Sequence, residues 1–448
     1  MTPRKYLGVL QMLRRALPSS RVITTASRGL TVLPAHELIE EERNRGYNPK
    51  HFYPVKPGDL FNNRYKVLTK LGWGASSTVW LAQDTRKWWC QSNRYVALKI
   101  AVSDFIDEDA AKHELDISQR LVTNPSHIGF QFVRTVLDSF EATGPHGTHT
   151  CLVFESMREP IWLHQRRWKN SDTPLPLLKV YIKFLLQGLD YLHSECRIIH
   201  TDLKLDNILM GFENPFVIED YVKTQAKPGK VKGRRSTLRS SNDFGELRPP
   251  YVTPFMKIVD FGLAQPGDGS EPLRHPIQPP AYFAPEVILG TGWTYKADIW
   301  NFGVLLWNLL EREDLFKHLR SSDGAYSVRA HLAEMIALLG PPPTELLDQE
   351  KRWSEVKWSH GVENSEGKIC HTAREYYGGP FFDSDGAFKY KALIPSAVTF
   401  EDTVLSLEGN DKRLFLSFAR KMLQWVPEER KTAKELVDDP WLDLEPRQ

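Results

Sequence analysis

The stretch that decides the fold is Ile198-Ile199-His200-Thr201-Asp202-Leu203-Lys204-Leu205-Asp206-Asn207-Ile208-Leu209. Apolar residues at both ends predict a loop with buried ends, and they leave a short polar segment that carries carboxylates, an amine and an amide. Such a cluster is costly to bury unless a substrate or a metal ion satisfies it. The segment therefore indicates a catalytic loop, with Asp202, Lys204 and Asn207 as the candidate functional side chains.

A glycine-bearing turn lies upstream, between two strand-like runs, in Leu71-Gly72-Trp73-Gly74-Ala75-Ser76-Ser77-Thr78-Val79. Glycine has no Cβ, so the backbone at Gly72 and Gly74 can approach a phosphate with its N–H groups facing the anion. Two glycines in a hairpin most often mark only a turn. The motif therefore needs support from the rest of the chain.

That support comes from Lys99, which lies between apolar neighbours on the next predicted strand, residues 96–100. A lysine on a buried strand needs a counterion. Glu114, on a predicted helix over about residues 107–121, is the best partner, and Glu108 on the same helix is the alternative.

Further carboxylates follow downstream. Lys257-Ile258-Val259-Asp260-Phe261-Gly262-Leu263 predicts a strand that delivers Asp260 into a turn. Because Mg²⁺ prefers oxygen ligands, Asp260 and Asn207 are the candidate metal ligands. Glu286, in Ala284-Pro285-Glu286, is predicted to pair with Arg430, although both could be ordinary surface charges. Asp298 is expected to have a structural role.

In this order and spacing the motifs resemble the eukaryotic protein kinase fold, over roughly residues 65–442. The resemblance implies an α+β bilobal fold, with a small β-rich N-lobe (65–157) and a mainly α C-lobe (158–442). It implies transfer of the γ-phosphoryl group of ATP, with Mg²⁺, to serine or threonine hydroxyls. Asp202 would receive the hydroxyl proton, Lys204 would neutralise the transferring phosphoryl group, and Lys99 with Glu114 would hold the other phosphates.

The same resemblance implies an ATP site in which apolar residues cover both faces of the adenine ring and the segment 155–157 offers backbone hydrogen bonds. The Phe154 side chain would lie at the back of this pocket. The expected ATP-binding residues are Leu71, Gly72, Trp73, Gly74, Ser77, Val79, Ala97, Lys99, Glu155, Met157 and Leu209.

Three features are similar to the SR-protein-specific kinases of the CMGC group, in particular to compact fungal members. Thr201 precedes Asp202 where most kinases have Arg, the runs 70–82 and 144–155 match, and an insertion at about 211–255 precedes Asp260. This likeness implies a serine kinase for Arg/Ser-rich splicing factors, present in cytoplasm and nucleus. The alternatives are a pseudokinase scaffold and a Ser/Thr kinase with another basic substrate.

Two stretches depart from that family. Where it carries an acidic run that docks Arg-rich peptides, this chain has Tyr326-Ser327-Val328-Arg329-Ala330-His331, with Glu311, Glu313 and Asp314 nearby. Phe283 replaces the arginine that usually precedes Ala284, and Pro279-Pro280 replaces Thr-Arg.

Regulation can also be predicted from residues. Between Gly262 and Tyr282 the only hydroxyl is that of Ser270, and Thr201 removes the arginine that would clamp an activation-loop phosphate. The sequence therefore predicts activity without phosphorylation of this segment.

The composition fits an enzyme of two or three packed lobes. The 448 residues are 41% hydrophobic and 25% charged, and the net charge of +2 gives no general attraction to nucleic acid or lipid. The four cysteines form no CxxC pair, and no run of 18 apolar residues occurs. We expect a monomer that binds protein substrates, without direct nucleic-acid or membrane partners.

Residues 1–50 are expected to be a flexible basic extension. The first 36 residues lack Asp and Glu and resemble a mitochondrial targeting peptide, with a disordered tail as the alternative. The insertion at 211–255 is expected to be exposed, with its basic run 227–239 a solvated linker, a localisation signal or an autophosphorylation segment. Residues 358–386 are expected to form a second surface excursion.

Overall fold

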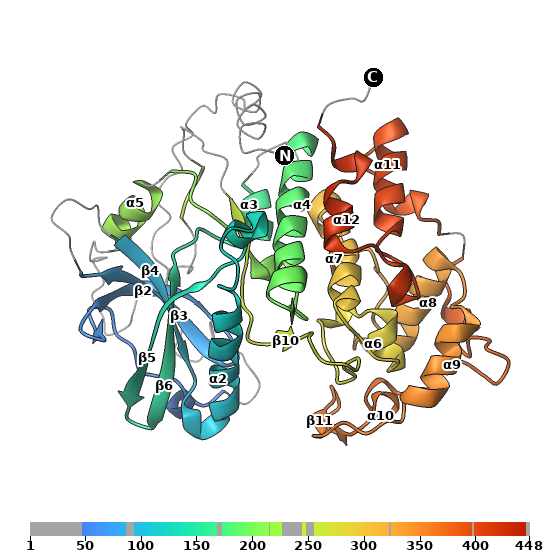
Figure 1. Ribbon diagram of the computed structural model, residues 1–448, viewed down its shortest axis with the longest axis horizontal. Helices are drawn as coiled ribbons and strands as arrows, with labels where there is room; N and C mark the ends of the chain where they lie inside the picture. Colours follow the sequence, from blue (N-terminus) through green and yellow to red (C-terminus); the bar gives the residue numbers. More distant parts are fainter. Residues whose placement is uncertain are drawn as a thin grey trace. The chain divides into compact units, whose positions relative to one another are not determined.

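The computed structural model describes residues 47–86, 94–167, 173–214, 216–225, 244–247, 255–321, 324–396 and 398–444 (Figure 1). The chain divides into two compact units. The first comprises Met1–Gln119, Arg134–Asp172 and Leu209–Lys257, and the second comprises Arg120–Val133, Thr173–Ile208 and Ile258–Gln448. The predicted basic start (1–36) and the basic run 227–239 lie outside the described residues.

The first unit is built on an antiparallel sheet with the strand order β1-β2-β3-β4-β6-β5. Its strands are β1 (Leu60–Phe61), β2 (Tyr65–Trp73), β3 (Ser77–Asp84), β4 (Arg94–Ala101), β5 (Val136–Gly144) and β6 (Gly147–Glu155). The helices of this unit are α2 (Asp104–Arg120), α3 (Ile161–Gln165) and α5 (Phe216–Gln225). The strands are rich in β-branched and aromatic residues, which pack well on a pleated surface.

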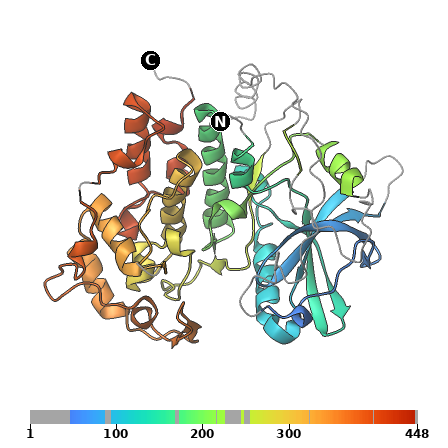
Figure 2. The ribbon, with the colours of Figure 1, turned by 180° about the vertical axis from the view of Figure 1, so that it is seen from behind.

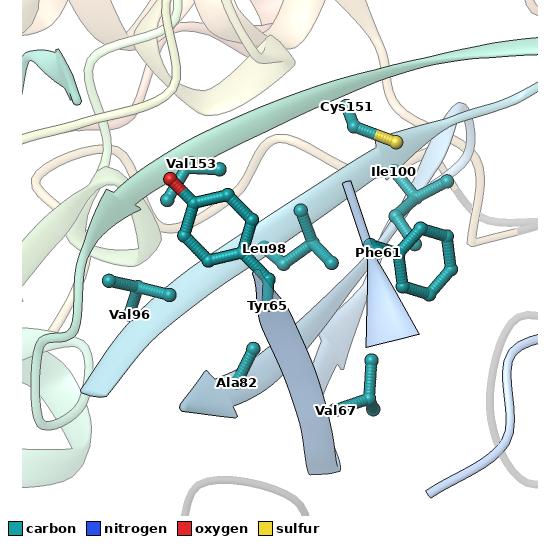
Figure 3. Close-up of a cluster of buried hydrophobic side chains, with 9 residues drawn as sticks. All are labelled: Phe61, Tyr65, Val67, Ala82, Val96, Leu98, Ile100, Cys151 and Val153. Atoms are coloured by element: carbon teal, nitrogen blue, oxygen red, sulfur yellow. The ribbon is translucent and has the colours of Figure 1, made fainter. Parts of the chain in front are cut away.

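Both faces of the sheet are covered. Figure 3 shows one cluster of buried side chains, in which Phe61, Tyr65 and Val67 meet Leu98 and Val153 of the central strands. Ala97, the neighbour of Leu98, points to the other face and belongs to a second buried cluster. This alternation explains why the middle of β4 is apolar without interruption.

Part of the insertion 211–255 is buried in that second cluster, so the prediction of an exposed insertion is wrong for these residues. Helix α5 packs Val217, Ile218 and Tyr221 together with Phe244 against the sheet. This helix is buried by contacts with a sheet face that is distant in the sequence. The Pro, Gly and basic residues around it are typical of an exposed loop, so the sequence pattern did not predict its burial.

The second unit is mainly helical (Figure 2). Its helices are α4 (Leu175–Asp190), α6 (Pro285–Leu289), α7 (Lys296–Leu310), α8 (Val328–Leu339), α9 (Thr344–Trp353), α10 (Ala373–Tyr377), α11 (Gly409–Arg420) and α12 (Ala433–Val437). Helix α7 is mainly apolar and is buried from Ala297 to Leu310, as expected for a helix in the interior of a unit. None of the helices in the described part of the chain is long and apolar enough to cross a membrane.

The second unit also has short strands. They are β7 (Ile198–Ile199), which pairs with β10 (Gln265–Pro266), and β11 (Val362–Glu363), which pairs with β12 (Ile369–Cys370). A further pair, β8 (Ile208–Met210) with β9 (Met256–Ile258), has most of its residues in the first unit. The prediction that 358–386 is a surface excursion is wrong in part. Cys370, Ala373 and Tyr377 are buried, as are Phe381 and Phe382, so this segment contributes apolar side chains to the second unit.

Candidate active site

The loop after β7 brings together the three polar side chains singled out by the sequence. Lys204 Nζ lies 3.0 and 2.7 Å from the two carboxylate oxygens of Asp202, and Asn207 Nδ2 donates to Asp202 Oδ2 at 2.9 Å. Asn207 Nδ2 also donates to the Asp202 carbonyl at 2.8 Å. The Asp202 carboxylate is therefore held in one orientation by a cation and an amide.

The buried carboxylate of Asp298, in the first turn of α7, fixes the backbone of this loop. It accepts hydrogen bonds from His200 N at 2.7 Å, from Thr201 N at 2.9 Å and from His193 Nε2 at 2.9 Å. Burial alone would raise the pKa of Asp298, but the hydrogen bonds and positive charge of the two histidines outweigh it, so the pKa lies below its ordinary value. Asp298 is thus an ionised support beneath the catalytic loop.

Asp260 is placed beside Asn207 by backbone bonds. Val259 N donates to the Asn207 carbonyl at 2.9 Å, and His200 Nε2 donates to the Val259 carbonyl at 3.0 Å. Asp260 has a left-handed backbone with φ 66°, which is uncommon for a residue with a side chain and is typical of functional turns.

In the first unit, an ion pair joins the strand lysine to the helix α2. Lys99 Nζ lies 2.7 and 2.8 Å from the two carboxylate oxygens of Glu114. Lys99 is on β4, between Val79 of β3 and Leu152 of β6, so its stem is surrounded by apolar strands. The alternative partner, Glu108, lies outside the described side chains.

The glycine turn joins β2 to β3. Gly74 N donates to the Ser77 carbonyl at 2.8 Å, which closes a tight loop, and Gly72 pairs with Val79. A Cβ added at Gly74 would approach no atom closer than Ser77 Oγ at 3.9 Å. Packing within the chain therefore does not require glycine at position 74, which is consistent with a need for space beside a ligand.

The expected adenine-contacting residues all belong to the first unit. Leu71 and Ala97 are buried in the second apolar cluster, Val79 packs against it, and Phe154 is buried there as well. The Glu155 carbonyl, offered by the sequence as an adenine acceptor, accepts hydrogen bonds of 2.6 and 3.2 Å from Arg134. A carbonyl oxygen has two lone pairs, so this contact leaves capacity for a second donor.

The segment after Asp260 is held by contacts that involve no phosphate. Thr201 Oγ1 donates to the Leu263 carbonyl at 2.8 Å, and Leu273 and Trp293 exchange backbone hydrogen bonds of 3.1 and 2.8 Å. The Arg274 guanidinium lies 4.3 Å from the ring centre of Trp353. This segment is therefore held by contacts with Thr201, Trp293 and Trp353 of the same unit.

The predicted partners Glu286 and Arg430 form a buried, two-pronged ion pair. The distances between nitrogen and oxygen are 2.6 and 2.7 Å, and both side chains are fully buried. Arg430 also donates to the carbonyls of Gln424 at 3.0 Å and Lys296 at 2.9 Å. The alternative of two surface charges is therefore wrong.

Sequence reasoning missed three residues that support the site. The sequence analysis considered Thr201 only as a replacement for the usual arginine. In the structure its hydroxyl donates a hydrogen bond to the Leu263 carbonyl. His193 and Arg134 were not singled out. Polar residues between buried apolar neighbours were an available signal for His193, but its partner lies 105 positions away in the chain.

Comparison with known proteins agrees with this geometry. The model of the protein kinase domain family matches residues 65–442. A serine/threonine protein kinase of Aspergillus fumigatus, AFUB_078980, is 37% identical over 443 residues, covering 99% of each chain. The serine/threonine-protein kinase SRPK of Physarum polycephalum is 31% identical and covers 90% of this chain.

Partial matches include human SRSF protein kinase 3, 37% identical over 40% of this chain and 31% of its own length. The crystal structure of the kinase domain of PF14_0431 aligns with a TM-score of 0.62 and 23% identity, over 88% of this chain and all of that one, which supports the fold alone.

The chain belongs to the protein kinase family. It is a protein serine/threonine kinase, and its relatives include kinases of the SR-protein kinase type.

We expect Asp298→Asn to lower the free energy of unfolding at neutral pH by about 1.5–3 kcal/mol, since charged hydrogen-bond acceptors contribute about that much. The native pKa of Asp298 is lowered, so this stabilisation is complete above the unfolded-state pKa of about 3.9 and is lost as pH falls towards the native pKa.

Thermal unfolding from pH 7 to pH 3 measures the difference between wild type and Asp298→Asn. The exposed Asp385→Asn is the control. A difference that stayed constant down to pH 3 would show that the Asp298 carboxylate is not an ionised support.

Proposed function

We propose that this kinase uses ATP and Mg²⁺ and phosphorylates serines in Arg/Ser-rich proteins such as splicing factors. The observation that carries the catalytic part is the orientation of the Asp202 carboxylate by Lys204 and Asn207 on a loop held by Asp298.

In the proposed reaction the substrate hydroxyl oxygen attacks the γ-phosphorus of ATP. The bond from this phosphorus to the oxygen that bridges the β- and γ-phosphates breaks, and ADP leaves with that oxygen. The hydroxyl proton passes to the Asp202 carboxylate. Lys204 is bound to the same carboxylate at 2.7 Å, so its ammonium would also lie close to the negative charge of the transferring phosphoryl group.

The donor set suits Mg²⁺. Asn207 uses its amide nitrogen on Asp202, so its oxygen can turn to a cation, and Asp260 adds a carboxylate. Within the described residues no three His, Cys, Asp or Glu side chains gather into a metal site, so phosphate oxygens and water would complete the coordination. Bound Mg²⁺ would neutralise phosphate charge.

Residues of the first unit would position the nucleotide. The Lys99 ammonium is oriented by Glu114, which supports a role in binding phosphate oxygens. The open space beside Gly74 supports phosphate approach to the turn, and the buried Leu71 and Ala97 offer apolar contact to an adenine ring.

Carboxylates near the catalytic loop support a basic substrate. Burial raises the pKa of Tyr282, and the negative charges of Asp314, Asp206 and Asp202 raise it further. Asp206 and Asp314 are exposed. They could attract arginines of a substrate, and relatives named SRSF protein kinase 3 agree with this reading.

The stretch 326–331 provides no carboxylate that could bind a basic peptide. Arg329 lies 4.6 Å from the ring centre of Tyr390, and His331 is buried with its Nδ1 bonded to the Tyr326 hydroxyl at 2.8 Å. Arginine recognition in the proposal therefore rests on the carboxylates beside the catalytic loop.

Purified protein should transfer labelled phosphate from ATP to an Arg/Ser-rich peptide, and Asp202→Asn should lower kcat at least about 100-fold, because it removes the proton acceptor. Nucleotide binding, measured by calorimetry, should survive in this variant. Transfer only to peptides without arginine would contradict the proposed Arg/Ser-rich substrate. Binding of ATP without transfer to any peptide would indicate a pseudokinase scaffold.

Because Thr201 holds the segment after Asp260, Ser270→Ala should keep kcat within about twofold of wild type. Thr201→Val should lower kcat about tenfold, the effect of one lost hydrogen bond, and Thr201→Ser should restore it. Steady-state kinetics of phosphatase-treated protein measure this. Loss of most activity in Ser270→Ala would mean that phosphorylation of the segment is required.

We propose a location in cytoplasm and nucleus, as the SR-kinase likeness implies, with the mitochondrion as the alternative through residues 1–36. A C-terminal fluorescent tag on the chain with and without these residues should give the same distribution. A mitochondrial signal that depended on residues 1–36 would establish the alternative.

A further inference from the structure

The N-terminal end of helix α8 carries an exposed, positively charged surface. Arg329 lies in the first turn of this helix, and Arg320 lies on the hairpin that precedes it. Lys391 begins the short 3₁₀ helix Lys391–Leu393, which contacts α8. All three basic residues are exposed. We call this set of three residues the α8 surface.

The three cations have no carboxylate partner in the described part of the chain. Arg329 and Lys391 form no ion pair there, and Arg320 donates to the carbonyl of Gly324 at 2.7 Å. The first turn of α8 contains no acidic residue. Cations that share one surface repel one another, so binding of an anion between them is electrostatically favourable.

The carboxylate that α8 itself carries is already engaged inside the unit. Glu334 is 6% exposed. Its Oε2 accepts a hydrogen bond from Lys317 N at 2.8 Å, and its Oε1 lies 2.7 Å from both His318 N and His318 Nδ1. Glu334 therefore does not neutralise the exposed cations at the start of the helix.

A ring contact holds Arg329 in place beside the segment that carries Lys391. The Arg329 guanidinium lies 4.6 Å from the ring centre of Tyr390, the residue directly before Lys391. A ring covers one face of a guanidinium and leaves its N–H edge for an acceptor, and a side chain already fixed in this way loses less freedom on binding. Leu393, which is 46% exposed on the same 3₁₀ helix, adds an apolar contact.

The α8 surface belongs to the same unit as the catalytic loop. Tyr326, two residues before α8, packs on Phe283 with 5.7 Å between the ring centres, and Phe283 and Asp202 line one pocket. A peptide bound at the α8 surface is therefore held to the body that carries Asp202. A flexible stretch of substrate can connect the two places.

We propose that the α8 surface docks an acidic segment of the kinase's protein substrates, rich in Asp and Glu and with a leucine that contacts Leu393. The charge of this surface is opposite to that of the acidic run that the SR-protein-specific kinases carry at the matching stretch. Docking at this surface requires no phosphoryl transfer. It therefore does not depend on the Arg/Ser-rich sequence proposed above for the phosphorylated region.

The first test measures peptide binding to the full-length protein by fluorescence anisotropy. The probe is a labelled peptide of about 12 residues, mostly Asp and Glu with interspersed Leu, and the comparison peptide has Asn and Gln in place of the acids. The acidic peptide should bind at least about tenfold more tightly, and raising the ionic strength from about 0.05 to 0.5 M should remove most of this difference. Equal affinity for the two peptides, or no binding of either, would overturn the docking surface.

Charge reversal tests whether the acidic peptide binds at this place. Arg329→Glu combined with Lys391→Glu should weaken its binding at least about tenfold and should create binding of a peptide with Lys in place of the acids. Both positions are exposed, so the double variant should fold, which circular dichroism checks. The matched control is Lys357→Glu combined with Lys434→Glu, at two other exposed lysines of the second unit, and it should bind as wild type. Wild-type affinity in the folded α8 variant would contradict the proposal.

Docking should lower KM and leave the chemical step unchanged. A substrate with one serine is joined through a flexible linker of about 20 residues to the acidic segment or to its Asn/Gln form. The acidic form should have a KM about tenfold lower at equal kcat with the wild type, and this advantage should disappear with the double variant. Equal KM values for the two substrates with the wild type would show that the surface does not recruit substrates.

Failure of the proposed function gives a different result. Absence of transfer to both linked substrates would contradict the proposed function, and the anisotropy measurements would then decide on the docking surface by themselves.

Discussion

The buried carboxylate of Asp298 is the constraint on which the catalytic loop depends. It lies in a helix that is buried from Ala297 to Leu310, where an isolated charge would be strongly disfavoured. Donors from His193, His200 and Thr201 compensate the lost hydration, and the pKa of Asp298 stays low as a result. The same bonds fix the backbone of His200 and Thr201, the two residues directly before Asp202. The hydrogen bonds that stabilise the Asp298 charge therefore also position Asp202.

From this loop, hydrogen bonds extend to the turn that carries Asp260 and to the segment that follows it. The His200 ring binds the Val259 carbonyl, Val259 N binds the Asn207 carbonyl, and the Thr201 hydroxyl binds the Leu263 carbonyl. None of these contacts needs a modification. A segment held in this way is ordered as soon as the chain folds, which agrees with the absence of an arginine at position 201 that could receive a phosphate.

The sequence predicted the fold and the Glu286–Arg430 pair correctly, because polar residues between buried apolar runs are few and their order is specific. The roles of Lys99, Asp202, Asn207 and Asp260 stay predictions. The sequence did not reveal the burial of Phe244 and Tyr221. Both lie in a largely polar insertion, and they are buried by contacts with a sheet face that is distant in the sequence. It also missed the second function of Thr201, because the acceptor lies 62 positions away and is a backbone carbonyl, which no residue type signals.

The two departures from the SR-kinase pattern belong to one physical change. Phe283 stands where arginine is usual, and Tyr326, from the stretch that lacks the acidic run, packs directly on it. An arginine at position 283 would be buried between two tyrosines, and the carboxylate of Glu334 on helix α8 is already used by the backbone nitrogens of Lys317 and His318. Aromatic packing therefore stands at the position where the family that the chain resembles usually has arginine. Replacing buried charge by well-packed apolar groups is often neutral for stability, so substrate selection could change here while the catalytic loop stayed intact.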